Sequence, residues 1–276
     1  MARNPDFKDR VSNLTALAPL AIMFGATAIP LYSSSTFDPM PETALEQILE
    51  SSSGVEIFSG LKADKREKIV AAYESTISQT MNLWENAPQQ YALASSVFLD
   101  SKPKTDSNGE LILAGVDQDT MQLWVYCEEK TNGSFECPGP TYLAHEIGGH
   151  IWATNTFGDD KIFSGSPSYQ ENSKTDDCVD KMIQTGAATC YGTRNLDEKI
   201  AEDFRLIVNL QTSPTFLDKN EVLVSQVDTK VKQAYLHDLK EGVDLFHENG
   251  AINQTEYQTV IDAMNQKSIS FDGYIN

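Results

Sequence analysis

The sequence predicts a single α+β domain, and three observations along the chain support this fold class. Residues 61–87 carry apolar side chains near helical spacing, which predicts a long amphipathic helix. Residues 110–129 are rich in apolar and β-branched residues with turn signals between them, a pattern typical of strands. Further helical segments follow towards the C-terminus, and no internal repeat interrupts them. The order of helices, a small sheet and then helices indicates an α+β domain.

The N-terminus has the features of an export signal. A short stretch with a small positive excess precedes residues 14–32, which contain no charged residue. Ala26 and Ala28 supply small residues at the offsets that signal peptidase requires. Two prolines and a glycine make this segment a poor membrane-spanning helix. We therefore expect residues 1–32 to be a signal peptide, with an uncleaved membrane anchor or a buried hydrophobic segment as the alternatives.

A connecting region is expected between this segment and the folded domain. Residues 33–42 (SSSTFDPMPE) have the composition of a linker, and residues 41–52 predict a short helix. We expect residues 33–60 to form a linker or a propeptide. Residues 61–276 are then the folded domain.

The elements of that domain follow one another in a readable order. Residues 91–101 (YALASSVFLDS) and residues 110–129 predict strands, and residues 139–155 predict the next helix. A long loop rich in Ser, Gly, Asp and Thr comes next. Residues 195–211 (NLDEKIAEDFRLIVNLQ) predict another helix, and residues 218–266 are mostly helical with polar faces.

Composition excludes one class of partner. The chain has 276 residues, of which 40% are hydrophobic, and its formal net charge is −19. This length and hydrophobic content suffice for one domain with a buried core. An acidic chain gains no counterion release on DNA or RNA, so we expect no nucleic-acid partner.

The four cysteines fit an exported protein. Cys127 and Cys137 flank a turn-rich connector, and Cys178 and Cys190 flank another expected loop. Four cysteines allow three pairings, and the two local pairs are favoured because each disulfide would close one loop. Metal binding by the cysteines and four buried free thiols are the alternatives.

The stretch HEIGGH contains the residue types of a zinc-peptidase helix, with one residue too many. In a regular helix, His145 and His150 would point about 140° apart and could not hold one ion. A π-bulge would absorb the extra residue, and Gly148-Gly149 tolerates the unusual backbone angles that a bulge needs. We therefore expect a bulged helix that brings both histidines to one metal. Glu146 and His150 as the ligand pair, and a chance grouping, are the alternatives.

A second segment offers the remaining ligand. Catalytic zinc takes three protein ligands and keeps one position open for water. Glu198 and Glu202 are four residues apart, so they share one face of the predicted helix at residues 195–211. One of them could ligate the metal while the other orients a histidine ligand. The alternative is an ordinary solvated helix face.

The segment CYGTRNLDEKIAEDFRLI resembles the corresponding part of the anthrax lethal factor catalytic domain. The same family includes the secreted Pro-Pro endopeptidases. The shared pattern is a tyrosine-glycine pair, a glutamate seven residues after the tyrosine, and A-E-x-F-R-L. It is matched here by Tyr191-Gly192, Glu198 and residues 201–206.

This resemblance implies a zincin-like metallopeptidase domain with a small mixed sheet, an active-site helix and a helical C-terminal part. It implies that Glu198 is the third zinc ligand beside His145 and His150. Glu202 would be a supporting acid that orients a histidine ligand, and Tyr191 would stabilise the oxyanion. The family has H-E-x-x-H, whereas H-E-x-x-G-H resembles the dipeptidyl peptidase III family, in which a bulged helix still delivers both histidines.

The expected function is that of a secreted zinc metallopeptidase acting on proteins or peptides. Glu146 would take a proton from water activated by Zn²⁺ and pass it to the leaving amine. An endopeptidase is expected, because no terminus-binding domain is evident. Residues 121–129 are the candidate edge strand for an extended substrate, or else an ordinary core strand. Membrane contact is expected only if the N-terminal segment stays uncleaved.

Two other functions remain open from the sequence. The first is a zincin-like domain that binds metal or a partner protein but has lost catalysis, because the extra glycine displaces Glu146. The second is an interaction module without metal, in which the match to zinc peptidases is accidental.

Overall fold

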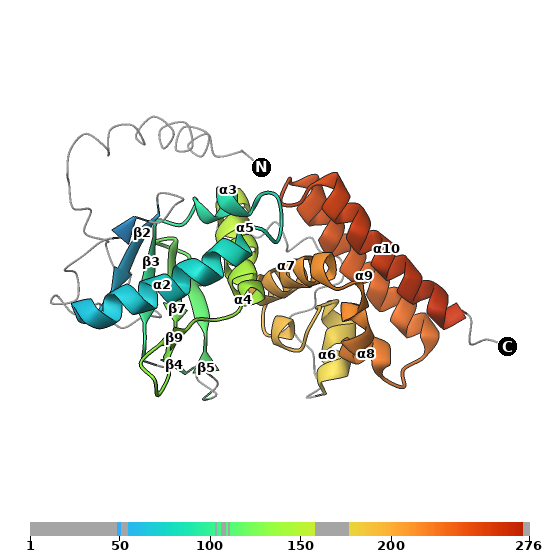
Figure 1. Ribbon diagram of the computed structural model, residues 1–276. Helices are drawn as coiled ribbons and strands as arrows, with labels where there is room; N and C mark the ends of the chain where they lie inside the picture. The colour runs from blue at the N-terminus through green and yellow to red at the C-terminus, as the bar shows by residue number, and fades with distance from the viewer. Residues whose placement is uncertain are drawn as a thin grey trace. The chain divides into compact units, whose positions relative to one another are not determined.

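A mixed five-stranded sheet and the helices around it make up the α+β fold that the sequence predicts (Figure 1). The computed structural model describes residues 49–50, 55–102, 104–105, 109, 111–157 and 177–272. The expected signal peptide or anchor at residues 1–32 lies outside the described residues. Most of the expected linker does too. No helix among the described residues is both long and apolar enough to cross a membrane.

The sheet has the strand order β1-β2-β3-β7-β6. The strands in that order are Leu49–Glu50, Glu56–Ser59, Ser96–Asp100, Gln122–Tyr126 and Ala114–Asp117. The pairs β2–β3 and β3–β7 are parallel, whereas β1–β2 and β6–β7 are antiparallel. Two small antiparallel ribbons flank it: β4 (Lys104–Thr105) with β5 (Leu111–Ile112), and β8 (Glu128–Glu129) with β9 (Phe135–Glu136).

The sheet begins before residue 61, where the sequence placed the start of the domain. Strand β2 pairs with a neighbour on each side, so residues 56–59 are part of the sheet. Ile57 and Phe58 are both buried, one on each face of the sheet. Leu49–Glu50 also forms a strand, which corrects the helix expected at residues 41–52 over those two positions.

The first long helix, α2 (Ala63–Thr80), ends earlier than the predicted helix at 61–87. A turn follows, and Pro88 stands in the first turn of the short helix α3 (Ala87–Tyr91). The buried face of α2 joins one hydrophobic cluster with side chains of β3 and β7. Its apolar period therefore serves to cover the sheet, as the amphipathic pattern predicts.

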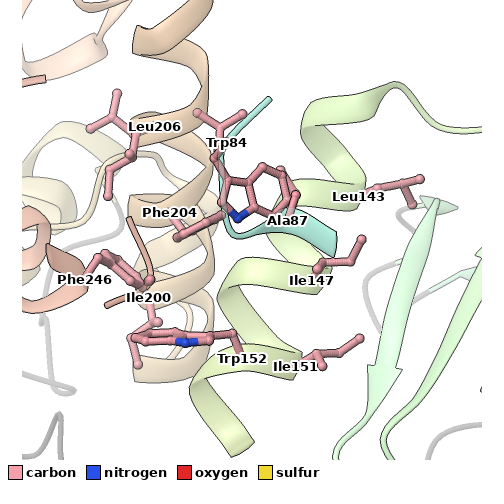
Figure 2. Packing of buried hydrophobic residues seen from close by; sticks show 14 of the residues in the cluster. Trp84, Ala87, Leu143, Ile147, Ile151, Trp152, Ile200, Phe204, Leu206 and Phe246 are labelled. Atoms are coloured by element: carbon pink, nitrogen blue, oxygen red, sulfur yellow. The ribbon is translucent and has the colours of Figure 1, made fainter. Parts of the chain in front are cut away.

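The helix that contains HEIGGH runs through three segments. They are α4 (Pro140–Ala144), the π-helix η2 (His145–Ile151) and α5 (Trp152–Phe157). Leu143, Ile147 and Ile151 point from it towards the strands (Figure 2). Trp152 points the other way, and its ring lies 5.6 Å from that of Phe246. This helix is therefore buried between the sheet and the C-terminal helices.

The C-terminal part is helical, as expected. Its longest members are α7 (Leu196–Thr212), α9 (Thr229–Glu248) and α10 (Gln254–Asp272). Shorter segments are η4 (Tyr191–Thr193), η5 (Pro214–Lys219) and α8 (Glu221–Val224).

The long loop predicted before residue 195 contains a helix, α6 (Cys178–Thr185). The side chain of Asp177 caps its first turn, and Gly186 ends it in the left-handed conformation at a φ of 63°. The rest of that predicted loop, residues 158–176, lies outside the described residues.

Candidate metal centre and cleft

The extra residue of HEIGGH is absorbed by a π-helix, as predicted. The widened segment covers His145–Ile151, which is longer than the single turn that the sequence required. It brings both imidazole rings to one side of the helix, with ring centroids 5.0 Å apart. The two histidines can therefore face a common point.

The two glycines serve a different purpose from the one expected. Neither has a positive φ, so neither is needed for an unusual backbone angle. A Cβ on Gly148 would stand 1.9 Å from the ring of Phe204, and one on Gly149 would stand 2.4 Å from the Cα of Ala201. Glycine is required because η2 and α7 approach too closely for any side chain between them.

This close approach brings the acids of α7 to the histidines. The side chain of Asn195 caps α7 by accepting a hydrogen bond from the backbone of Glu198 at 2.8 Å. Oε2 of Glu198 lies 3.2 Å from Nε2 of His145 and 3.5 Å from Nε2 of His150. The two motifs that the sequence singled out therefore meet at one place.

Glu202 holds the first histidine from behind. Its Oε1 lies 2.8 Å from Nδ1 of His145, and its Oε2 accepts a hydrogen bond of 2.7 Å from Thr189. Arg205 donates to Oε1 at 3.1 Å. Glu202 is 2% exposed, so the solvated helix face considered above is excluded for this residue. A carboxylate behind a ligating imidazole fixes its tautomer and orientation.

The charges of the cluster follow from burial and proximity. Burial alone would lower the pKa of His145, but Glu198 and Glu202 outweigh it and raise that pKa to about 10. Burial alone would raise the pKa of Glu198, but its contacts with His145 and His150 bring it well below the usual range. The raised pKa of His145 and the lowered pKa of Glu198 therefore both reflect the attraction between the imidazoles and the carboxylates of this group.

Glu146 has a different environment. Its side chain is buried, and its Oε2 has no hydrogen-bond partner among the described residues. Burial raises its pKa, while His145 and His150 act in the opposite direction. A buried carboxyl group of raised pKa, next to a metal-ligand set, is suited to exchange a proton.

Tyr191 stands at the mouth of the site in η4. Its hydroxyl donates to Oε1 of Glu198 at 3.4 Å, and its ring lies 5.9 Å from that of His145. The guanidinium of Arg194 lies over the Tyr191 ring, 4.2 Å from its centroid. The phenol can therefore face a molecule bound beside the histidines.

Three ligand atoms converge in a way that can hold a metal ion. The donor atoms of His145, His150 and Glu198 all lie within 4.8 Å of one another. Oε2 of Glu198 faces both imidazoles yet has no hydrogen-bond partner among the described residues. Two imidazoles and one carboxylate, with a carboxylate behind one histidine, fit a metal site. Glu146 is outside this group, so the alternative ligand pair of Glu146 and His150 is not favoured.

A cleft of about 570 Å³ opens over the cluster. One wall is formed by residues 111–116, and the other by side chains of η2, η4 and α7. Strand β6 in the first wall pairs only with β7 among the described strands, so its other edge is open. The expectation that residues 121–129 form the edge strand is wrong, and the alternative of a core strand is confirmed. Its core, β7, pairs on both sides and is buried along its whole length.

Nothing in the sequence pointed to β6 as the edge strand, because Ala114–Asp117 is short and weakly apolar. Its place at the edge depends on β7 pairing with β3 on its other side, a contact between strands distant in the chain that composition does not encode.

The two local disulfides are present as predicted. Cys127 pairs with Cys137, and Cys178 pairs with Cys190, directly before Tyr191. Disulfides persist in oxidising compartments, so the chain fits an extracytoplasmic environment.

The remaining histidines lie away from the cluster. His237 is exposed on α9 beside Asp238 and Glu241, and these three form a loose surface group. His247 stacks on Tyr257 with ring centroids 4.4 Å apart.

No family model, curated protein or solved structure matches this chain.

Proposed function

We propose that this protein is a secreted zinc metallopeptidase that cleaves internal peptide bonds. The observation that carries the proposal is the convergence of His145, His150 and Glu198 in a cleft that also contains Glu146. Two imidazoles and a carboxylate are a common ligand set of catalytic zinc, and they leave one position for water.

The same proposal includes a zincin-like fold related to the lethal factor and Pro-Pro endopeptidase group. Its support is an active-site helix beside a mixed sheet, a second helix that supplies the third ligand, and the Tyr191 motif before that helix. The π-helix supports delivery of both histidines despite the longer H-E-x-x-G-H spacing.

The roles of the residues follow from their positions. Zinc, when bound, supplies a Lewis acid that lowers the pKa of water. Glu146 takes a proton from the attacking water and gives it to the amine of the cleaved bond. Tyr191 donates a hydrogen bond to the oxygen on which negative charge develops. Glu202 keeps Nε2 of His145 turned towards the ligand position.

The cleft favours an extended peptide as substrate. The open edge of β6 can hydrogen-bond a peptide backbone as an added strand, and Leu111, Ile112 and Val116 on the same wall offer apolar contacts. A strand laid along β6 passes beside Glu146 and the histidines, which line the same cleft.

The first test is metal content of the purified protein by mass spectrometry, with single variants beside it. We expect one zinc per chain in the native protein. Glu198→Ala should lose the zinc, whereas Glu202→Ala should weaken zinc binding to a lesser degree. His237→Ala is the matched control, because it removes a histidine from the loose surface group on α9.

The variants separate the possible outcomes. Loss of zinc in Glu202→Ala but not in Glu198→Ala would overturn the ligand assignment. Zinc without cleavage of any peptide in a library would identify a metal-binding domain that lacks catalysis. Absence of zinc from the native protein would refute the metallopeptidase.

A further inference from the structure

The segment before Tyr191 is held by three buried hydrogen bonds to its backbone. Tyr235 of α9 donates to the carbonyl of Ala187 at 2.7 Å, and Asn220 donates to the carbonyl of Ala188 at 3.0 Å. The backbone N–H of Ala188 donates to Oδ1 of Asp203 at 3.1 Å. Three successive backbone groups are therefore each fixed by a side chain from a different helical region.

Asp203 is the member of this set that belongs to the metal-ligand helix. It lies on α7, five residues after Glu198, and its Oδ2 forms a buried ion pair with Lys199. Both side chains of the pair are almost fully buried. A Cβ on Gly242 would stand 2.8 Å from Oδ2, so α9 packs directly against this carboxylate.

Stability alone is a weak reason for such a pair. Removing two charges from water costs as much as or more than their attraction returns, and apolar residues of similar size often serve equally well. The ion pair does fix the orientation of the Asp203 carboxylate. Lys199 occupies one carboxylate oxygen of Asp203 and leaves the other aimed at the N–H of Ala188.

Segment 187–190, which these contacts anchor, directly precedes Tyr191 and its phenol. Thr189 donates to Glu202 and accepts from the backbone N–H of Gly192, and Cys190 is tied to α6 by its disulfide. Tyr191 then places its hydroxyl against Glu198. The position of the phenol relative to the metal ligands therefore depends on how segment 187–190 is anchored to α7.

We propose that Asp203, oriented by Lys199, is a positioning residue that anchors segment 187–190 to α7 and thereby places Tyr191 against the site. Its effect on catalysis rests on the metallopeptidase function proposed above. Its effect on the backbone does not, because the hydrogen bond to Ala188 exists whether or not the cluster turns over a substrate.

Two double variants isolate that hydrogen bond. Lys199→Met with Asp203→Asn removes both charges and keeps an acceptor for the N–H of Ala188. Lys199→Met with Asp203→Leu removes the charges and the acceptor together. Both variants lack a buried unpaired charge, so they differ mainly in the contact under test.

Hydrogen exchange of segment 187–192 is the first measurement. We expect exchange at least about tenfold faster in the leucine variant than in the asparagine variant, because a lost backbone anchor permits local opening. Exchange of β3 and β7 in the same samples reports global stability and is expected to be equal. Equal exchange of segment 187–192 in the two variants would overturn the proposal.

Kinetics test the consequence for Tyr191. We expect kcat about tenfold lower in the leucine variant than in the asparagine variant, with KM and zinc content alike, because a small misplacement of a catalytic group lowers the rate. In a Tyr191→Phe background this difference should vanish. A difference that persists there, or zinc lost only from the leucine variant, would show that Asp203 acts on another part of the site.

The two measurements separate this proposal from the proposed function. If the native protein binds zinc but cleaves no peptide, the peptidase proposal fails, and the exchange measurement still decides whether Asp203 anchors the segment.

Discussion

At the scale of single residues, the glutamates of the site differ because their neighbours differ. Glu198 faces two imidazoles, which hold its pKa well below the usual range and keep it ionised as a ligand must be. Glu146 is buried with one oxygen unpartnered among the described residues, and burial raises its pKa. A carboxylate that stays charged suits a metal ligand, whereas one that readily takes a proton suits a general base.

Glu146→Gln tests this division of roles. Glutamine keeps the size and the hydrogen-bonding oxygen but cannot accept the proton of water. We expect zinc content to stay at the native level while kcat falls by about 10²-fold to 10⁴-fold, the usual contribution of a general base. Metal analysis and peptide cleavage on the same preparation measure both. Native kcat in this variant would assign the proton transfer to another group.

Gly149→Ala tests the contact between η2 and α7. The new Cβ would stand 2.4 Å from backbone Cα of Ala201, which cannot rotate away as a side chain could. We expect a loss of about 1–3 kcal/mol in the free energy of unfolding, measured by denaturant titration. Gly139→Ala is the control, since a Cβ there meets nothing within 4 Å and the residue has no positive φ. Equal stability of the two variants would show that the helices can separate without cost.

At the scale of elements, the sequence predicts what depends on local spacing and misses what depends on distant pairing. The widened helix was predictable, because His145 and His150 are five residues apart and one metal requires them on one side. The hydrogen bond between Asp203 and Ala188 was not predictable from the sequence. Ala188 is 15 residues away and contributes only its backbone N–H, which every residue type except proline has. The edge position of β6 was missed for the same reason, since β6 lies at the edge only because β7 pairs with the distant β3 on its other side.

Deletion of Gly149 tests whether the π-helix is needed beyond the spacing of the histidines. The deletion restores H-E-x-x-H, so a regular helix could present both imidazoles. Since the π-helix absorbs the extra residue, the deletion leaves Ile151 and Trp152 facing the same way, but it removes the residue that lies against Ala201 of α7. We expect a lower melting temperature and weaker zinc binding, measured by thermal unfolding and metal analysis. A deletion variant with native stability and activity would show that the bulge is dispensable.

At the scale of the whole molecule, the candidate metal site lies between the helix that contains HEIGGH and the C-terminal helices. The histidines lie on η2, whose apolar side chains contact the sheet, while Glu198 and Glu202 lie on α7, which packs against α9 and α10 (Figure 1). A metal held by both helices binds the folded chain far better than the unfolded one. Its binding energy is therefore added to the stability of the fold.

Removal of the metal should consequently loosen the whole domain. With free zinc at 100 to 1,000 times the dissociation constant, bound metal adds about 3–4 kcal/mol to the free energy of unfolding. We expect a chelator to lower the melting temperature of the native protein and added zinc to restore it. Glu198→Ala should melt at the same temperature with or without the chelator, because it has lost the ligand that links the two helices.

His237→Ala should respond to the chelator as the native protein does, since that histidine belongs only to the loose surface group. A chelator response that survives in Glu198→Ala but disappears in His237→Ala would place the stabilising metal on the surface of α9.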